Sequence, residues 1–304
     1  MADIKLRRTL LFVPGNMPSM LQNIPLFECD SVIIDLEDAV NHAEKDAARH
    51  LVSRFLSSWK DRNKEVLVRI NPLYTKWGGD DLQAILPQMP DAIRFPMCET
   101  GEMALELDAE LAKYETANGL QVGRFGILPS IETVKSVLNA YAIATSTKRI
   151  FGLAFGAEDY TASMGVARTN SGEDLLHPRM MVVMAAKAAG IQAIDSVFSD
   201  VNDMEALRRE TELVKRIGYT GKCMVNPRQT DIIHEVFAPK QEEIDYAQDV
   251  VEAIKQAQKM GTGVISLRGK MVDAPVVKRA IHTLQLAYAQ GMVDTPLDEE
   301  ILNG

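Results

Sequence analysis

Eight short apolar segments alternate with amphipathic stretches over roughly the first 230 residues of the chain. The segments lie at residues 9–13, 31–35, 66–71, 92–95, 125–131, 150–155, 193–198 and 221–225. Apolar runs of this length are typical of strands that are covered on both faces of a sheet. Strands alternating with helices form right-handed βαβ units, and eight such units favour a closed barrel over an open doubly wound sheet. We therefore predict an α/β fold, a TIM (β/α)8 barrel.

The stretches between and after these segments have helical periodicity. The clearest cover residues 44–57, 100–116, 133–146 and 179–189; beyond the eighth strand come 241–260 and 276–290, with a strand-like piece at 264–267. A single barrel needs little beyond its eighth helix. The pattern thus predicts a catalytic barrel domain, residues 1–240, and a C-terminal helical extension, residues 241–304. We expect the extension to cap the site or to pack on a neighbouring subunit.

The composition narrows the class of protein and of partner. With 304 residues, 46% of them hydrophobic and 25% charged, the chain can bury a sizeable core. A net charge of -9 argues against a nucleic-acid partner, because phosphate binding needs a basic field. No apolar run approaches the length of about 18 residues that a membrane span needs. Cys29, Cys98 and Cys223 have no metal or disulfide spacing, so we expect a cytoplasmic protein.

Carboxylates follow two neighbouring strands of the predicted barrel. Glu132 comes directly after the fifth strand, and Asp159 lies shortly after the sixth. The C-terminal ends of barrel strands meet at one rim, where active sites lie. Two oxygen ligands there suit Mg²⁺, which usually takes one or two protein carboxylates and completes its shell with substrate and water. The alternative is that each carboxylate caps the helix that follows.

An arginine, Arg69, lies inside the apolar third strand. Burying a guanidinium is unfavourable unless it is paired, and its planar fork suits the recognition of a carboxylate. One hypothesis is therefore a substrate-binding arginine. The alternative is a structural ion pair with Asp35, Glu37 or Asp38, which follow the second strand. The two are compatible, and one of these acids could also act as a base.

The turn after the first strand contains Pro14 and Gly15. Such a turn can present backbone N–H groups to anionic oxygens, although Pro-Gly pairs mark turns of many kinds. Motifs of other enzyme classes are missing from the sequence: it contains no GxGxxG, GxxxxGK[ST] or GxSxG, and its five histidines show no triad spacing. Nucleotide binding through those motifs and nucleophilic serine catalysis are therefore not expected.

Five motifs, taken together and in order, resemble the citrate lyase β-subunit family, within the wider HpcH/HpaI aldolase-like group of malyl-CoA and citramalyl-CoA lyases. They are residues 8–15 (RTLLFVPG), 35–40 (DLEDAV), 68–71 (VRIN), 156–160 (GAEDY) and 269–275 (GKMVDAP). The resemblance extends from Arg7 to Ala287 and so covers nearly the whole chain. It implies a TIM barrel with a C-terminal extension, dependence on Mg²⁺, and reversible carbon–carbon cleavage of a 3-hydroxyacyl thioester. It also implies a homo-oligomer, commonly a trimer or hexamer.

The resemblance also assigns roles to single residues. Glu132 and Asp159 match the family's metal ligands, and Glu132 also contacts substrate. Arg69 matches its substrate-binding and catalytic arginine, while Phe12 and Gly15 fall in its first substrate-contacting turn. Asp273 matches an acid that, in some relatives, reaches the active site of the neighbouring subunit and takes part in enolate chemistry.

The expected activity is cleavage of a citryl thioester, carried by an acyl carrier protein or by CoA, to oxaloacetate and an acetyl thioester. The chain would act as subunit β of citrate lyase, with transferase and acyl-carrier subunits. Some CoA-using relatives carry lysines just after the first turn, but residues 16–44 contain neither Lys nor Arg. This difference favours a carrier-bound prosthetic group over free CoA. The alternatives are a stand-alone citramalyl-CoA or malyl-CoA lyase, a malyl-CoA thioesterase, and a non-catalytic scaffold.

Overall fold

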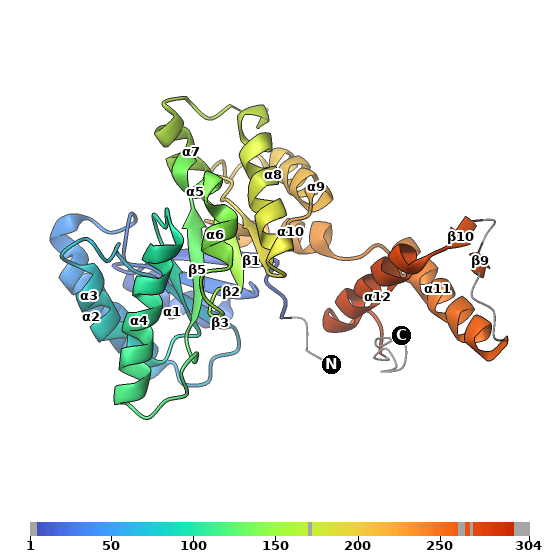
Figure 1. Ribbon diagram of the computed structural model, residues 1–304. Helices are drawn as coiled ribbons and strands as arrows, with labels where there is room; N and C mark the ends of the chain where they lie inside the picture. Colours follow the sequence, from blue (N-terminus) through green and yellow to red (C-terminus); the bar gives the residue numbers. More distant parts are fainter. Residues whose placement is uncertain (1–4, 170–171, 261–264, 268–269, 295–304) are drawn as a thin grey trace. The chain divides into compact units, whose positions relative to one another are not determined.

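Figure 1 shows the computed structural model of the chain, which describes residues 5–169, 172–260, 265–267 and 270–294. Its contacts divide the chain into two compact units. The larger unit runs from Arg7 to His234, and the smaller unit contains Lys5, Leu6 and the described residues from Glu235 onward. Each unit has a hydrophobic core of its own.

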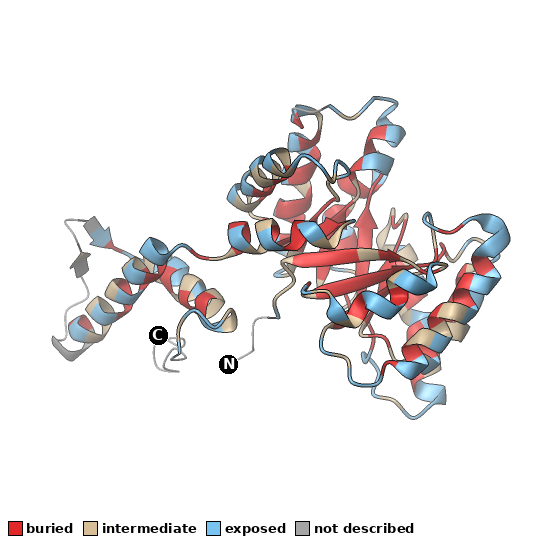
Figure 2. Cartoon of the chain, turned by 180° about the vertical axis from the view of Figure 1, so that it is seen from behind, coloured by how far each residue is buried: buried red, intermediate tan, exposed pale blue. Residues whose placement is uncertain are grey.

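Eight parallel strands form a closed barrel in the larger unit, which confirms the predicted fold. They are β1 (Thr9–Pro14), β2 (Ser31–Asp35), β3 (Glu65–Arg69), β4 (Ala92–Phe95), β5 (Gly126–Ile131), β6 (Gly152–Phe155), β7 (Gln192–Asp195) and β8 (Gly221–Met224). Each strand pairs with the next along the chain, and β8 pairs with β1, so the sheet has no free edge. Figure 2 shows these strands mostly red, as expected for a sheet covered on both faces.

The interior of the barrel is built in layers. One apolar layer takes a residue from every strand: Leu10, Ile33, Leu67, Ala92, Leu128, Ala154, Ile194 and Cys223. Because side chains alternate along a strand, the residues two positions further along also point inward. These are Phe12, Asp35, Arg69, Arg94, Ser130, Gly156, Ser196 and Val225. An apolar layer therefore lies beneath a polar one, and the polar layer is nearer the C-terminal ends of the strands.

Helices follow the strands and cover the outside of the barrel (Figure 1). They are α1 (Pro18–Asn23), α2 (Lys45–Ser58), α3 (Gly78–Ile85), α4 (Gly101–Ala117), α5 (Val134–Leu138), α6 (Ala140–Ala144), α7 (Ala157–Met164), α8 (Glu173–Ala188), α9 (Met204–Ile217) and α10 (Thr230–Phe237). In α2, the residues Ala48, Val52 and Leu56 are buried at helical spacing, while much of the remaining surface is exposed. The apolar stripe of each such helix is what holds it against the sheet.

Two helices differ from the prediction. The helix expected at 133–146 is divided at Asn139, whose side chain donates a hydrogen bond to the carbonyl of Glu99 at 2.9 Å and whose backbone ends α5 and begins α6. This hydrogen bond anchors the Asn139 side chain to the preceding βα unit at the point where the two helices meet. The helix expected at 179–189 begins earlier, at Glu173, and contains Pro178. Proline in the second turn removes only one backbone donor, so it does not stop this helix.

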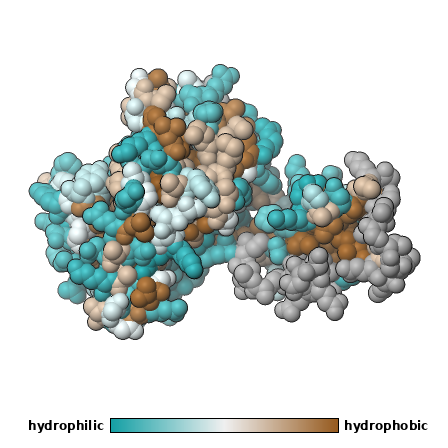
Figure 3. Space-filling model, viewed as in Figure 1, coloured by the Kyte–Doolittle hydropathy of each residue, from teal (hydrophilic) through white to brown (hydrophobic). Residues whose placement is uncertain are grey.

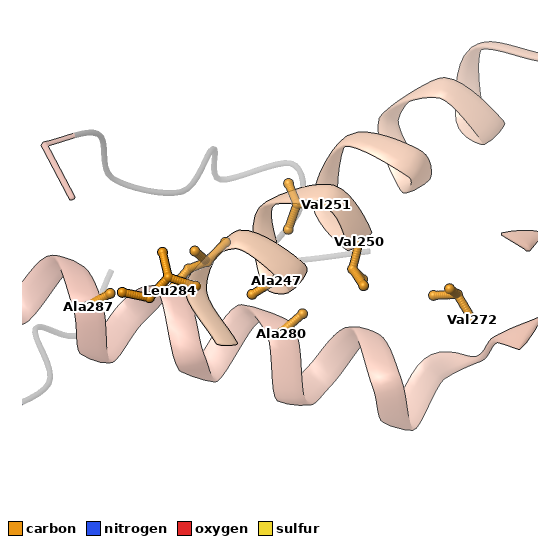
Figure 4. Close-up of a cluster of buried hydrophobic side chains, with 8 residues drawn as sticks. Ala247, Val250, Val251, Val272, Ala280, Leu284 and Ala287 are labelled. Carbon is orange, nitrogen blue, oxygen red and sulfur yellow. The ribbon is translucent and has the colours of Figure 1, made fainter. Parts of the chain in front are cut away.

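The smaller unit is a pair of helices with a short hairpin between them. It contains α11 (Gln241–Met260), β9 (Ile265–Leu267), β10 (Lys270–Val272) and α12 (Ala274–Ala289), and the two strands are antiparallel. Figure 4 shows its core, where Ala247 and Val250 of α11 face Ala280 and Leu284 of α12. The predicted C-terminal helical extension is therefore present. Its last helix begins two residues earlier than expected, and position 264 of the expected strand lies outside the described residues.

The surface differs between the two units. The visible face of the barrel unit is mostly hydrophilic with scattered hydrophobic residues, whereas hydrophobic residues gather on the visible face of the smaller unit (Figure 3). Tyr246, Ile254, Val276 and Ile281 are only partly buried against its core. Within the described part of the chain, no helix combines the length and the hydropathy that a membrane crossing requires.

Candidate active site

A cavity of about 440 Å³ opens at the C-terminal ends of the barrel strands. Its floor is the polar interior layer: seven of the eight residues of that layer line it, all except Ser130. Loop and helix residues that follow the strands complete the wall, among them Asp38, Glu132, Glu158 and Asp159. The fold thus brings together residues from widely separated parts of the sequence.

Arg69, at the end of β3, is bound by the acids that follow β2. Its Nε and Nη2 donate to the two carboxylate oxygens of Asp35 at 2.7 and 2.6 Å, because the two residues are register partners on adjacent strands. Its Nη1 lies 2.8 Å from Glu37 and 3.2 Å from Asp38. The ion-pair alternative is therefore realised with all three acids. Arg69 nevertheless lines the cavity, with its guanidinium carbon 5.0 Å from the centre of the Phe12 ring.

The loop that carries these acids is held by two residues that sequence analysis missed. Lys45, at the start of α2, donates from Nζ to the backbone carbonyls of Leu36 and Glu37 at 2.9 and 2.7 Å. Asn71 donates from Nδ2 to the carbonyl of Leu36 at 2.9 Å. Lys45 is only 4% exposed, although lysine side chains normally stay in water. Its task is to fix the loop, and only its tertiary position shows this.

Electrostatics in this cluster shift two pKa values in the same direction. Burial raises the pKa of Glu37 to about 8; repulsion by Asp38 and Glu132 adds to the shift, while the attraction of Arg69 opposes it. Burial by itself would lower the pKa of Arg69, but the three acids raise it, so the guanidinium stays charged. Glu37 consequently holds its proton near neutral pH. That property is expected of a group that exchanges a proton during catalysis.

Glu132 lies directly after β5 and is 4% exposed. Its Oε1 accepts a hydrogen bond of 2.6 Å from the backbone N–H of Met97, a residue in the left-handed region with φ 49°. Burial raises the pKa of Glu132, and the attraction of Arg94 and the Met97 hydrogen bond oppose that shift. The residue does not cap α5, because Thr133 does. The helix-cap alternative is therefore wrong for Glu132.

Asp159 lies in the first turn of α7 and is exposed. Partial burial and the negative charges of Asp38 and Glu158 raise its pKa, and Arg69 opposes the shift. The field of α7 favours a carboxylate at this place, so a helix-stabilising role is compatible with the structure. Asp159 and Glu132 also repel each other across the cavity, which raises the pKa of Glu132.

The two carboxylates fit a magnesium ion better than a zinc ion. Among the described residues, no group of three or more His, Cys, Asp or Glu side chains could hold a metal. A site made of Glu132 and Asp159 therefore offers two oxygen ligands and leaves the remaining positions to substrate and water. Mg²⁺ uses such sites, whereas zinc sites take three or four protein ligands.

Gly156 leaves the space that the side chain of Glu132 occupies. A Cβ at Gly156 would lie 2.6 Å from both Cβ and Oε2 of Glu132, well inside ordinary contact distance. The residue is the N-cap of α7, so it also positions the helix that carries Asp159. Residues 156–160 thus affect both carboxylates. The missing side chain of Gly156 leaves room for Glu132, and the segment itself carries Asp159.

Two residues predicted for the site are not among those that line the cavity. Gly15 does not line the cavity; its N–H donates to the carbonyl of Asp35 at 2.8 Å, and a Cβ would lie 2.7 Å from that oxygen. Its absent side chain allows β1 to turn close to β2. Asp273 belongs to the smaller unit, where it is exposed and caps α12, accepting a hydrogen bond of 3.1 Å from the N–H of Val276. Their roles toward substrate stay predictions.

Arg94 lines the cavity and was missed by sequence analysis. It is 3% exposed and is the register partner of Arg69 on the adjacent strand β4. Burial lowers its pKa. The sequence did contain a signal for Arg94. It lies inside a four-residue apolar strand, and, as with Arg69, a buried guanidinium there needs a partner or a substrate to explain it.

Comparison with known proteins places this site in context. The family described as HpcH/HpaI aldolase/citrate lyase matches residues 8–227. The chain is 43% identical over 295 residues to citrate lyase subunit beta of Leuconostoc mesenteroides, covering 97% of this chain and 98% of that protein. It is 31% identical to mitochondrial citramalyl-CoA lyase of Mus musculus, over 92% and 86% of the two chains. Among solved structures, protein CitE from Mycobacterium tuberculosis with magnesium, acetoacetate and coenzyme A is similar, with a TM-score of 0.76 at 26% identity and coverage of 93% and 98%.

Proposed function

Because the chain belongs to the HpcH/HpaI aldolase/citrate lyase family, we propose that it is a magnesium-dependent carbon–carbon lyase that cleaves a citryl thioester to oxaloacetate and an acetyl thioester. The observation that carries the proposal is the arrangement of Arg69, Glu132 and Asp159 around one cavity. A scaffold protein would not need a buried carboxylate and an arginine at the mouth of a barrel. The 43% identity to a citrate lyase β subunit supports the choice of substrate.

Glu132 and Asp159 would hold the metal. When bound, Mg²⁺ acts as a Lewis acid on the hydroxyl and carboxylate oxygens of the substrate. The Met97 N–H and Gly156 fix the carboxylate of Glu132, so its position is set before the metal or the substrate binds. The related M. tuberculosis protein was solved with magnesium, which supports this assignment.

The chain's own acids would move the proton. Asp38 lines the cavity, and Glu37 shares the Nη1 of Arg69 with it. We assign the removal of the hydroxyl proton to the carboxylate of Asp38, because Asp38 lines the cavity and the raised pKa of Glu37 keeps that residue protonated near neutral pH. The bond between the hydroxyl carbon and the thioester CH2 group then breaks, the hydroxyl carbon becomes the ketone of oxaloacetate, and the electron pair passes to the thioester enolate. Arg69 balances the negative charge of the oxyacid, and protonation of the enolate carbon gives the acetyl thioester.

We propose that the smaller unit takes part in forming an oligomer. Asp273 is exposed at the N-terminus of α12, and hydrophobic residues gather on the visible face of this unit (Figure 3). Both features support a homotrimer or hexamer in which residues 241–304 pack on a neighbouring subunit and Asp273 supplies the acid to its site. The lack of Lys and Arg in residues 16–44 supports an acyl carrier in place of free CoA, together with transferase and acyl-carrier subunits. Three free, buried cysteines agree with a cytoplasmic location.

A stand-alone citramalyl-CoA lyase is the second candidate, because the mouse citramalyl-CoA lyase is 31% identical over most of the chain. A malyl-CoA lyase or thioesterase would use the same site. The products separate these activities. A citryl thioester yields oxaloacetate, citramalyl-CoA yields pyruvate, malyl-CoA yields glyoxylate, and a thioesterase releases free malate and CoA.

The test is an assay of the purified full chain with Mg²⁺ and citryl-, citramalyl- or malyl-CoA. We expect oxaloacetate from citryl-CoA at the highest kcat/KM, and its loss in Arg69→Lys, which lacks the planar fork. Arg124→Lys is the matched control, because Arg124 lies on the exposed surface away from the cavity. A higher kcat/KM for another thioester would overturn the citryl assignment, and no turnover of any of the three CoA thioesters or of a citryl group on an acyl carrier protein would overturn the lyase.

A further inference from the structure

A buried arginine in the cavity floor, Arg94, has a hydrogen-bond donor without a partner among the described residues. Arg94 is 3% exposed, and its Nη1 reaches only the carbonyl of Pro129, at 3.3 Å. Among the described residues its Nε has no partner. A guanidinium has five N–H donors, and leaving them unsatisfied away from water is unfavourable. The cavity floor therefore contains donors that the protein itself does not use.

The two arginines of this floor differ in how they are bound. Arg69 donates to Asp35 through two nitrogens, and its third lies against Glu37 and Asp38. Arg94 is its register partner on β4, yet it forms no ion pair within 4.0 Å among the described residues. Glu132 attracts it only over a longer distance. Arg94 thus remains available for a second anionic group.

The adjacent strand offers another unused polar atom. Ser130 on β5 is fully buried, and its Oγ has no partner in the described structure. It lies two residues beyond Leu128, the register partner of Arg94, and it points into the same interior layer. Two neighbouring strands therefore each place an unsatisfied donor inside the barrel, and of the two residues only Arg94 lines the cavity.

We propose that Arg94 binds the second carboxylate of a citryl group and so selects citryl over citramalyl and malyl thioesters. The inference rests on the proposed function. A citryl group carries a CH2–COO⁻ substituent on its hydroxyl carbon, where citramalyl carries a methyl group and malyl a hydrogen. The carboxylate beside the hydroxyl is common to all three, so it cannot distinguish them. A methyl group or a hydrogen would leave the Arg94 donors unpaired, and a site with unpaired buried donors discriminates strongly against such an analogue.

A competing role for Arg94 is to balance the charge of Glu132, since its attraction opposes the raised pKa of that carboxyl. Charge balance acts through the metal site, which every substrate uses. Its loss would lower turnover of all three thioesters by one common factor. Selection by a carboxylate contact would instead change the ratio between substrates.

The experiment measures that ratio. For the wild-type chain, Arg94→Met and Arg94→Lys, kcat/KM is determined for citryl-CoA and citramalyl-CoA at saturating Mg²⁺. We expect Arg94→Met to lower the citryl-to-citramalyl ratio about 100-fold, because a charge-assisted contact is lost. Arg94→Lys keeps the charge without the fork and should lower the ratio about tenfold. Arg124→Met makes the same substitution on the surface and should leave the ratio unchanged.

A binding measurement separates this inference from the proposed activity. Calorimetry with Mg²⁺ compares oxaloacetate with pyruvate, which differ by the same carboxylate. Tighter binding of oxaloacetate to the wild type, lost in Arg94→Met, supports the subsite whatever the lyase assay gives. Equal loss for both thioesters, or equal affinity of the wild type for both oxyacids, would overturn it. If Arg94→Met does not fold, the Arg94→Lys ratio and affinities decide in the same way.

Discussion

Replacing Gly156 with alanine should inactivate the enzyme through the metal site while leaving the barrel folded. The added Cβ would lie 2.6 Å from Cβ of Glu132, whereas ordinary van der Waals contacts begin at 3.4 Å. The side chain of Glu132 cannot relieve this overlap by rotation, because its Cβ is attached directly to the backbone. The overlap with Oε2, also 2.6 Å, adds to the displacement of the carboxylate.

The size of the effect follows from that overlap. Glu132 or α7 must move by nearly an ångström, and a misplacement of about 1 Å in a catalytic group can lower the rate about 100-fold. Overpacking of this kind also destabilises the fold by about 1–3 kcal/mol. We therefore expect kcat for citryl-CoA to fall about 100-fold, with a higher Mg²⁺ concentration needed for half-maximal activity.

The assay is a Mg²⁺ titration of initial rates, with thermal unfolding of the same samples. Gly79→Ala is the control, because a Cβ at this exposed position in α3 meets nothing within 4 Å. It should keep full activity and gain up to about 1 kcal/mol of stability from the helix propensity of alanine. The reasoning would be refuted if Gly156→Ala kept kcat and its Mg²⁺ dependence within about threefold of the wild type.

Three further predictions test the proposed acid Asp273, the raised pKa of Glu37 and the buried ion pairs of Glu210. Asp273→Asn should lower kcat about 100-fold without changing Tm, because asparagine also caps α12; unchanged steady-state turnover would remove Asp273 from the mechanism. In the folded chain Glu37 has a pKa of about 8, whereas its ordinary pKa is 4.5. Ionisation of Glu37 is therefore less favourable in the folded than in the unfolded chain, and the free energy of unfolding of the metal-free protein falls as the pH rises from 4.5 to 8. Glu37→Gln should therefore raise Tm at pH 8.5 but not at pH 4.5, and an equal change at both pH values would contradict this. Glu210 of helix α9 forms ion pairs with Lys222 at 2.7 Å and with Arg179 at 3.2 Å. Burial opposes ionisation there, but these cations lower the pKa of Glu210 to about 2, so its stabilisation is present above pH 4.5 and is lost as pH falls toward 2. Glu210→Gln should cost about 3 kcal/mol in urea unfolding at pH 7 and less at pH 3; the same loss at both pH values would show that the pair does not titrate as described.

The strands of this fold could be predicted because burial on both faces leaves a strong apolar signal. Each predicted segment overlaps the observed strand; half of the ends coincide, and the others differ by one to three residues. Arg69 was recognisable for the opposite reason, since a charge within such a segment needs an explanation. The barrel register then made Asp35 its partner, and register is a property of the closed sheet that no single segment reveals.

The remaining features depend on tertiary distances. Within the described structure, the Nε of Arg94 has no partner because of what surrounds β4, and the residues next to Arg94 in the sequence do not reveal this. The contact between Gly156 and Glu132 joins residues from different βα units. The break at Asn139 depends on a carbonyl at Glu99. Such facts require the positions of two elements, whereas periodicity describes one element at a time.

The two interior layers of the barrel separate the residues that determine folding from the residues that determine substrate preference. The apolar layer, from Leu10 to Cys223, fills the barrel and is where changes in volume would affect folding. The layer above it, from Phe12 to Val225, has one position per strand unit, and all of these positions except Ser130 line the cavity. Substrate preference can therefore diverge among related enzymes by exchange of residues in the upper layer, while the lower layer preserves the scaffold. In this chain Arg94 is the upper-layer position at which such divergence would be easiest to detect.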